Sequence, residues 1–282
     1  MLATLGDLVE DIVVDVLGPL QYGSDTESHL QRRQGGSAAN VAVAAARMSH
    51  PSRFLGQIGV DRAGNSLVTE LVAHGVDVSC ATRTGSTGAI VVLVDDHGER
   101  TMLTDRRSCV EVTQPDPAWL DGVTALHVPF YSFTEPPLSD TAVELVRVAH
   151  DRELVVSIDL SSDAVLRTFG IDAAHRLIEE LTPSVVFANL DEAQAMRIDG
   201  ALAGAVTTVK RGSASALVHR PGLETIEVPA LPVATTVDST GAGDTFAAGF
   251  LCFEAWQDDP IAACRAGHEA AAALLNSRQQ PT

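Results

Sequence analysis

A glycine-rich turn followed by an acidic residue is the part of this sequence best suited to chemistry. Gly241, Ala242, Gly243 and Asp244 precede three phenylalanines spaced four and three residues apart, which predicts a helix beginning near Gly243. Small residues at a helix start leave backbone N–H groups open to an anion, and the helix dipole favours negative charge there. A carboxylate in that first turn can accept a proton from a hydroxyl that attacks a bound phosphoryl group. The simpler alternative is a helix start in which Asp244 only stabilises the dipole.

Other nucleotide-binding designs lack their key residues. A Walker A loop needs Gly-Lys followed by Ser or Thr, whereas the only lysine of this chain, Lys210, is followed by Arg211. The sequence contains no His-Arg-Asp or Asp-Phe-Gly, and no Gly-x-Gly-x-x-Gly follows the first expected strand. A phosphate bound by this chain is therefore expected at residues 241–244.

A second pattern suits recognition of a polyol. Gly35 and Gly36 permit close approach of the backbone, and Asn40 offers both hydrogen-bond donors and acceptors. The alternative is a turn leading into an ordinary helix that is capped by Ser37 or Asn40. Asp11 lies just past the first expected strand, where its carboxylate can accept bonds from two hydroxyls, and a surface acid is the plain alternative.

Composition limits the classes of partner. Hydrophobic residues make up 45% of the 282 residues, enough for the core of one large domain. A formal net charge of −18 argues against nucleic acid and anionic membranes, which attract clustered Lys and Arg. The four cysteines show no zinc or disulfide spacing, and no apolar stretch reaches the ~20 residues of a membrane helix. We expect a cytoplasmic protein.

The elements that must position these residues alternate between strand and helix. The expected strands are residues 2–5, 125–128, 154–158, 185–188 and 206–209, and the expected helices are residues 139–150, 172–181 and 190–197. This alternation predicts an α/β fold, a mostly parallel sheet with helices on both faces, formed by residues 1–282 as a single domain. Such sheets bind ligands beyond the carboxyl ends of their strands. Tyr131 follows one of these strands, where it can stack on a ring or base, or pack in the core.

Two β-like segments interrupt this alternation. Residues 12–34 lack helical periodicity and contain turn residues, which indicates short strands. Residues 86–105 are typical of a hairpin with its turn at 95–98. Their separation from the main pattern predicts a small β-sheet lid over the larger domain.

Taken together, these motifs resemble the ribokinase family, also known as the phosphofructokinase B family of carbohydrate kinases. The family's carboxyl-terminal signature, close to Asp-Thr-x-Gly-Ala-Gly-Asp-x-Phe, is similar to residues 238–246, with Ser239 in place of Thr. Its amino-terminal signature, Gly-Gly leading to Ala-Asn, is similar to residues 35–40. Further landmarks follow in order at residues 56–64, 87–89, 98–100 and 189–192, so the resemblance covers essentially the whole chain.

The resemblance implies a Rossmann-like core with a β lid that closes over the sugar, and often a dimer contact. It implies that Asp244 is the catalytic base and that Gly241, Ala242 and Gly243 form the anion hole. The other implied positions bind ligands. Asp11, Gly36 and Asn40, with Gly35 in the same signature, correspond to substrate-binding positions. Asn189 and Glu192 correspond to the pair that orders phosphate and, through water, Mg²⁺, and Asp238 and Thr240 to a loop that holds a monovalent cation, commonly potassium.

Departures from the family pattern concern the nucleotide and the substrate. After Lys210 and Gly212 the usual second glycine is missing, and Lys210 either approaches the phosphates of ATP or is simply solvated. His268 occupies a position near the adenine that is often Asn. Ser37 and Val9 stand where ribokinases proper tend to carry Lys and Asn, which argues against ribose itself.

We therefore expect an ATP- and Mg²⁺-dependent kinase that acts on a primary hydroxyl of a small sugar or a sugar-containing nucleoside. Potassium is a further candidate cofactor, and a homodimer is the expected assembly. Residues 23–26 and 99–106 are similar to a bacterial subgroup associated with pseudouridine breakdown, so that nucleoside is a candidate. The alternatives from other classes are a non-catalytic nucleotide or metabolite sensor that has kept the fold, and an oxidoreductase with a dinucleotide site.

Overall fold

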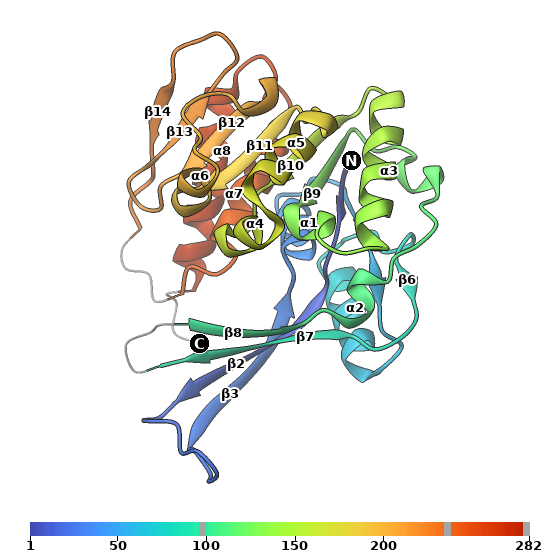
Figure 1. The fold of residues 1–282 in the computed structure, drawn as a ribbon, viewed down its shortest axis with the longest axis vertical. Helices are drawn as coiled ribbons and strands as arrows, with labels where there is room; N and C mark the ends of the chain where they lie inside the picture. Colours follow the sequence, from blue (N-terminus) through green and yellow to red (C-terminus); the bar gives the residue numbers. More distant parts are fainter. Residues whose placement is uncertain (96–99, 234–237, 279–282) are drawn as a thin grey trace.

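An eight-stranded sheet runs through the larger part of the protein (Figure 1), which is known from a computed structural model that describes residues 1–95, 100–233 and 238–278. The strand order is β14-β13-β12-β11-β10-β9-β1-β4. Neighbours from β12 to β4 are parallel, whereas β13 pairs antiparallel with both β12 and β14. The strands are β1 (Leu2–Leu5), β4 (Ser52–Leu55), β9 (Ala125–Pro129), β10 (Val155–Asp159), β11 (Val185–Asn189), β12 (Val206–Lys210), β13 (Ser215–His219) and β14 (Ile226–Pro229).

Both faces of this sheet are buried because successive side chains of its strands enter different cores. In β11, Val186 and Ala188 belong to one hydrophobic cluster, while Val185 and Phe187 belong to the other. The first cluster packs under α3 (Leu138–Asp151), α4 (Asp163–Phe169), α5 (Ile171–Leu181) and α6 (Leu190–Ala195), and the second under α1 (Ser37–Arg47), α7 (Ala242–Leu251) and α8 (Pro260–Ser277). The α/β fold class expected from the sequence is confirmed, and the five expected strands begin or end within one residue of their predicted limits.

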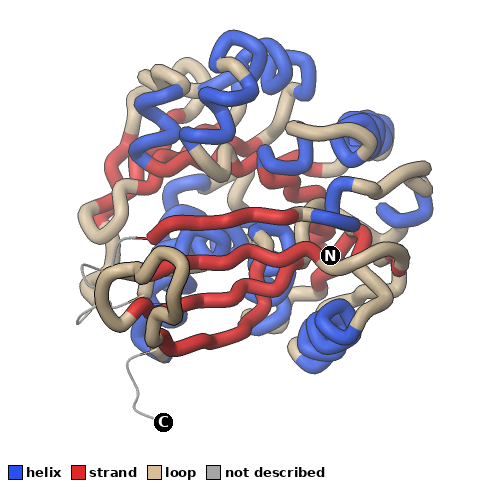
Figure 2. Tube along the Cα trace, turned by 60° about the horizontal axis from the view of Figure 1, so that its bottom comes forward, coloured by secondary structure: helices blue, strands red, loops and turns tan. Residues whose placement is uncertain are grey.

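A second, four-stranded sheet lies apart from the large one and forms the lid (Figure 2). Its order is β3-β2-β7-β8, with β2 (Val9–Val16), β3 (Ser28–Gly35), β7 (Gly88–Val94) and β8 (Arg100–Asp105). The turn predicted at residues 95–98 falls mostly outside the described residues. The short strands predicted within residues 12–34 are instead two eight-residue strands of one long antiparallel pair. Asp11 therefore lies inside β2, not in a loop past β1.

The chain passes from the large body to the lid at closely neighbouring points. Gly36, between β3 and α1, has a φ of 97°, and a β-carbon there would lie 2.2 Å from the Asp7 carbonyl oxygen. Arg106, just after β8, donates to both carboxylate oxygens of Asp7, from Nε at 2.7 Å and from Nη2 at 2.8 Å. Both side chains are mostly buried, so this bidentate ion pair fixes the lid end of β8 to the segment that joins β1 to β2.

The remaining elements are short or lie beside β4. Helix α2 (Arg62–Ala73) shares a third hydrophobic cluster with α1, and β5 (Gln57–Ile58) pairs with β6 (Thr82–Arg83). In the described ranges, the 3-10 helices are η1 (Arg107–Val110), η2 (Pro117–Leu120), η3 (Phe130–Phe133) and η4 (Leu202–Gly204). Among the described residues, no helix is both long and apolar enough for a membrane crossing.

Candidate active site

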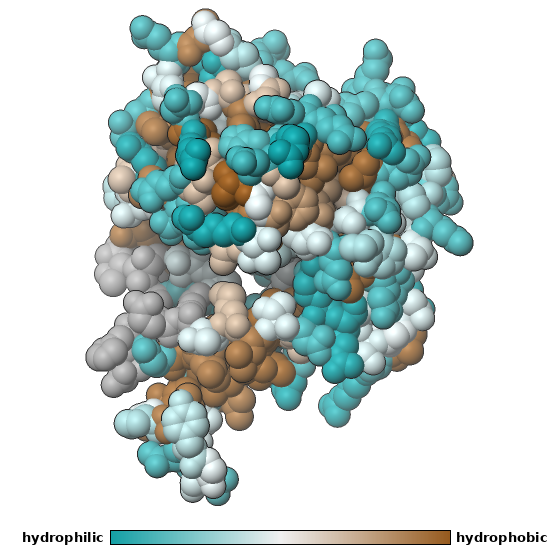
Figure 3. All heavy atoms as spheres, viewed as in Figure 1, coloured by the Kyte–Doolittle hydropathy of each residue, from teal (hydrophilic) through white to brown (hydrophobic). Residues whose placement is uncertain are grey.

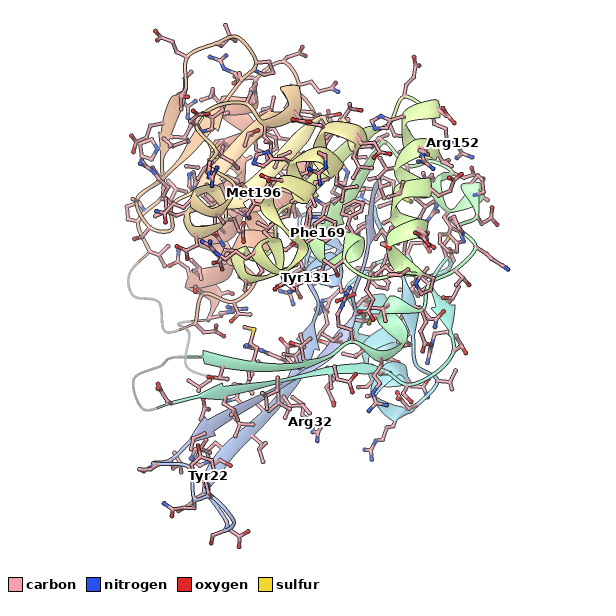
Figure 4. All side chains as sticks on the ribbon, in the orientation of Figure 1. Tyr22, Arg32, Tyr131, Arg152, Phe169 and Met196 are labelled. Carbon is pink, nitrogen blue, oxygen red and sulfur yellow. The ribbon has the colours of Figure 1, made fainter. Side chains whose placement is uncertain are left out.

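The candidate site lies at the carboxyl ends of the parallel strands, facing the lid. Asp159, Asn189 and Lys210 are the last residues of β10, β11 and β12, three neighbouring strands of the sheet. Because these strands are parallel, their final side chains meet at one edge, where ligands bind in folds of this kind. Tyr131, in the turn after β9, lies where the large body faces the lid (Figure 4).

Helix α7 begins at Ala242, one residue earlier than predicted, and its start is made of small residues. Gly241 is the N-cap residue with a φ of 73°, and no side chain caps the helix. The Ala242 amide donates to the Ser239 carbonyl oxygen at 3.1 Å, so it is already used by the preceding turn. The N–H groups of Gly243 and Asp244 belong to the first turn, which has no intrahelical acceptors. An anion can approach these two amides.

The Asp244 carboxylate is held by the start of α1. Ser37 Oγ donates to Asp244 Oδ1 at 2.6 Å, and Asn40 Nδ2 donates to Asp244 Oδ2 at 2.8 Å. Asn40 Oδ1 in turn accepts from Gln34 Nε2 at 3.0 Å, which fixes the orientation of the amide. The suggestion that Ser37 or Asn40 caps α1 is wrong: Gly36 is the N-cap residue and neither side chain caps the helix, because both are turned toward Asp244.

Burial is the main cause that raises the pKa of Asp244 above its usual value. The hydrogen bonds from Ser37 and Asn40 lower that pKa, the nearby Asp159 carboxylate raises it, and the Lys210 ammonium lowers it. A carboxylate with a raised pKa is a stronger base than an exposed one, while it stays ionised at neutral pH when the pKa remains below that value. The environment therefore suits proton abstraction from a hydroxyl.

Lys210 forms a buried ion pair at this edge and is not solvated, so the solvated alternative is wrong. Its Nζ lies 2.7 Å from Asp159 Oδ2, and the two side chains are 15% and 7% exposed. A β-carbon on Gly243 would lie 3.4 Å from Lys210 Nζ, so the ammonium group reaches the first turn of α7. The one lysine of the chain thus brings a positive charge beside the amides of that turn.

Glu192 and Asn189 form a capping box at the start of α6. Asn189 donates to Glu192 from its backbone N at 2.7 Å and from its side-chain Nδ2 at 2.6 Å, and the Glu192 amide donates to Asn189 Oδ1 at 2.9 Å. Glu192 is only 2% exposed. Burial first, and then the Asp159 carboxylate, raise the pKa of Glu192 to about 7.

These acids fit Mg²⁺ held through water better than direct coordination. Among the described residues, no group of three or more His, Cys, Asp or Glu side chains is arranged to hold a metal. Mg²⁺ usually keeps several waters and takes its other oxygen ligands from one or two carboxylates and from substrate phosphates. Buried Glu192 and Asp159 supply oxygen acceptors for such waters at the edge where phosphate is expected.

The raised pKa of Glu192 predicts a stability that depends on pH. Because the pKa is higher in the folded protein, folding favours the protonated form of Glu192. The stabilisation of the fold by protonated Glu192 is fully present below its unfolded pKa of 4.5, and it is lost as the pH rises through about 7. We expect Glu192→Gln, which can still accept the bond from the Asn189 backbone N but not the second bond from Asn189 Nδ2, to gain unfolding free energy relative to the parent as pH rises over this range. Urea unfolding from about pH 5 to about pH 8 measures the difference. Glu179→Gln, on the exposed face of α5, is the control, and an equal response of both variants would contradict the prediction.

The predicted substrate residues of the lid lie next to the start of α1. A β-carbon on Gly35 would lie 2.1 Å from Asp11 Oδ1, so the half-buried Asp11 carboxylate packs directly on the Gly35 backbone. Asp11 is paired in register with Arg33 of β3. Arg33 Nη1 donates to Asp238 Oδ2 at 2.8 Å, which connects the lid to the loop before α7.

The predicted monovalent-cation residues are engaged by an arginine from the end of α8. Arg278 Nη1 donates to the carbonyl oxygens of Asp238 and Thr240, at 3.0 Å and 2.7 Å. The same nitrogen lies 3.8 Å from Asp238 Oδ2. A metal ion does not fit between these carbonyls while the guanidinium group bonds to both.

The remaining predicted residues differ in position. Gly212 lies in the exposed turn between β12 and β13 with a φ of 62°. His268, in α8, is buried: its Nε2 lies 3.3 Å from the Val228 carbonyl oxygen and its ring meets Phe246 edge-on at 5.1 Å. Burial lowers the pKa of His268. Burial raises the pKa of Tyr131, although a hydrogen bond with Ser162 acts to lower it. The roles of Gly212 and His268 at a nucleotide stay predictions.

Sequence reasoning missed several residues of the site. Asp159 follows directly after the expected strand 154–158. This position could have identified it, because ligands bind beyond the carboxyl ends of parallel strands. Arg33 and Arg278 had no local signal, since each reaches Asp238 from a distant part of the chain. Gln34 is only six residues from its partner Asn40, but the sequence pattern did not indicate that the two side chains meet.

Comparison with known proteins relates these features to a family. The profile of the pfkB family carbohydrate kinases matches residues 1–280. The chain is 32% identical over 258 residues to a fructokinase of Salmonella typhimurium, covering 86% of this chain and 81% of the relative. It is 31% identical over 227 residues to an ATP-dependent ribose-1-phosphate kinase of Halopiger xanaduensis, covering 77% and 72%. The solved complex with ATP and Mg²⁺ of an E. coli protein provisionally named ribokinase II shares the fold, with a TM-score of 0.82 at 20% identity over 98% of this chain and 92% of that one.

Proposed function

Because this chain belongs to the pfkB family of carbohydrate kinases, we propose that it transfers the γ-phosphoryl group of ATP to a primary hydroxyl of a small sugar or a sugar-containing nucleoside. The observation that supports this most strongly is the Asp244 carboxylate in the first turn of α7, beside the Lys210 ammonium group. A base, bare amides and a positive charge at one helix start are what phosphoryl transfer to an alcohol requires.

In the proposed reaction Asp244 accepts the proton of the acceptor hydroxyl. The hydroxyl oxygen forms a bond to the γ-phosphorus while the bond from phosphorus to the β,γ-bridging oxygen breaks, which releases ADP. Ser37 and Asn40 hold the carboxylate in position through the two bonds that they donate to it. Proton transfer to a base held in this way is typically worth about 10²–10⁴-fold in rate.

The negative charge that develops on the transferred group is stabilised from the α7 side. The first-turn amides of Gly243 and Asp244 offer donors, and Lys210 offers a cation that is already oriented by Asp159. Mg²⁺, if bound, would offset part of the negative charge of the phosphates. Asn189, Glu192 and Asp159 are the residues that would order its waters. The named complexes and activities of relatives support ATP and Mg²⁺ as partners of this reaction.

The acceptor is proposed to lie between the lid and the start of α1. Asp11 on β2 offers carboxylate oxygens to hydroxyl groups, and Gly35 and Gly36 bring the backbone close to them. A fructokinase among the relatives favours a sugar. The half-buried Tyr131 ring favours a nucleoside as the alternative, because a base can stack on it.

A test of this acceptor site is Gly35→Ala. The new methyl group would lie 2.1 Å from Asp11 Oδ1, so the carboxylate has to move. We expect kcat/KM for the acceptor to fall by roughly 10²-fold, the scale of an ångström-sized misplacement. The affinity for ATP should change little, as measured by calorimetry. Gly200→Ala is the control, because nothing lies within 4 Å of a β-carbon there; equal kinetics for both variants would contradict the assignment.

A homodimer through the lid is the proposed assembly. Apolar side chains gather on the lid (Figure 3). By the strand register, Leu30 and Leu103 lie on the same face of the lid sheet, and they are 66% and 55% exposed. Large exposed apolar side chains on one sheet are typical of contact surfaces. A cytoplasmic location, and the absence of nucleic-acid or membrane partners, stay predictions from composition.

The proposed function is tested by measuring ATP consumption over a panel of pentoses, hexoses, fructose phosphates, keto-deoxy acids and nucleosides, pseudouridine included. We expect turnover with at least one acceptor that carries a primary hydroxyl. Tight binding of an acceptor and of ATP without any turnover would favour the sensor, and an absorbance change with a nicotinamide cofactor would favour the oxidoreductase.

A further inference from the structure

The loop before α7 is folded around the side chain of Asp238. Asp238 Oδ1 accepts from the Thr240 backbone N at 2.9 Å and from Thr240 Oγ1 at 2.6 Å. This small turn directs the carbonyl oxygens of Asp238 and Thr240 toward a common point. One nitrogen, Arg278 Nη1, occupies that point and donates to both carbonyls.

The oxygens around Arg278 are of the kind that bind a monovalent metal ion. Two backbone carbonyls and a carboxylate oxygen surround a single positively charged nitrogen. The carboxylate is also bonded by Arg33 at 2.8 Å, so it already faces two guanidinium groups. A metal ion placed there would have to displace Arg278 and would stand beside the charge of Arg33. Potassium, expected from the family resemblance, therefore does not fit this loop as it is folded.

Arg278 is held in place by the packing of α8 on α7. It is the C-cap residue of α8, where a positive charge is favoured by the helix dipole. The two helices approach closely at Gly249, where a β-carbon would lie 2.8 Å from the Ala266 carbonyl oxygen. Because the helices cannot slide freely past this contact, the end of α8 is fixed relative to the start of α7.

We propose that the Arg278 guanidinium is a built-in cation for the loop that precedes α7, and that it replaces a monovalent metal ion there. This inference rests on the proposed function, since the loop ends at Gly241, directly before the amides assigned to the phosphate. Arg278 is a positioning residue: it touches the two loop carbonyls and acts on the phosphate only through the loop. The consequence is a kinase whose activity does not need potassium.

A cavity of about 380 Å³ adjoins the loop and is lined by Arg33, Thr240, Gly241 and Arg278, with parts of α1 and α8. Because Thr240 and Arg278 line this cavity, a small cation can reach the loop through it once the guanidinium is removed. Potassium should then bind where the wild-type protein holds Arg278, because carbonyl and carboxylate oxygens remain as ligands.

The test compares the wild-type protein, Arg278→Ala and Arg278→Lys in potassium chloride and in tetramethylammonium chloride at equal ionic strength. We expect the wild-type protein to have the same kcat and melting temperature in both salts. Arg278→Ala should lose roughly 10-fold or more in kcat without potassium, the value of bonds from a charged donor, and regain part of it with potassium. Its melting temperature should rise in potassium relative to tetramethylammonium. Arg278→Lys, which keeps the charge, should lose less.

The matched control is Arg265→Ala, on an exposed face of the same helix, which should behave as the wild-type protein in both salts. Several-fold activation of the wild-type protein by potassium would overturn the proposal, as would an Arg278→Ala variant equal to the wild type without potassium. The melting measurement needs no turnover. If no acceptor is found, potassium-specific stabilisation of Arg278→Ala alone would still support the cation site while the proposed function failed.

Discussion

Replacing Asp244 with Asn is expected to lower kcat by roughly 10²–10⁴-fold, the usual scale for loss of a general base. Asn has nearly the same shape, so the start of α7 is retained, but an amide cannot accept the proton of the acceptor hydroxyl. Ser37 Oγ can still donate to the Asn side-chain oxygen, whereas the Asn40 amide must reorient to avoid facing a second amide donor. The loss should therefore fall on kcat, with ATP binding retained.

The measurement is steady-state kinetics with the acceptor identified by the screen, together with calorimetric titration of ATP. Asp258→Asn is the control, because Asp258 is exposed in the segment between α7 and α8. It should keep the kinetics of the parent. An Asp244→Asn variant that turns over at the parent rate would remove Asp244 from the mechanism.

The second large effect is expected for Lys210→Met. Removing a preorganised donor to a developing anion typically costs about 10²–10³-fold in kcat. The same change leaves the buried Asp159 carboxylate without the ammonium group that lies 2.7 Å away. Breaking a buried pair in this way costs about 3–5 kcal/mol. We therefore expect a variant that is both slower and less stable.

A double variant separates the two effects of Lys210. In Lys210→Met with Asp159→Asn the unpaired charge is gone, so much of the unfolding free energy should return, as measured by urea unfolding. The rate should stay low, because the positive charge beside Gly243 is still missing. Recovery of the rate together with the stability would mean that Lys210 only supports the fold. Lys210→Arg, which keeps the charge, should retain more activity than Lys210→Met.

The parallel strands of the large sheet could be predicted because both of their faces are buried. A strand such as β11 then consists of consecutive apolar residues, which stand out between polar helix starts. The lid strands were harder. They carry charged residues such as Glu10 and Arg32 among apolar ones, because much of their surface is exposed. The lengths of β2 and β3 were therefore underestimated.

The helix start at residues 241–244 could be predicted because the small residues and the acid are contiguous in sequence. The partners of that acid could not, since Ser37 and Asn40 are 207 and 204 residues away from it. A motif pointed to Asn40, but as a substrate ligand, and only the packing of α1 against α7 turns it toward Asp244. Arg278 is a similar case, because its place at the loop depends on how α8 lies on α7.

The ion pair between Asp7 and Arg106 has a mechanical consequence for the lid. It lies at the root of the small sheet, next to the close contact of Gly36 with the Asp7 carbonyl, so the root is the least displaceable part. Eight residues of β2 extend about 26 Å at ~3.3 Å per residue. A rotation of about 10° around the root would therefore carry the far end, near Tyr22, some 4–5 Å at about this strand length. Small angular changes at this charged root would therefore produce large displacements at the tip of the lid.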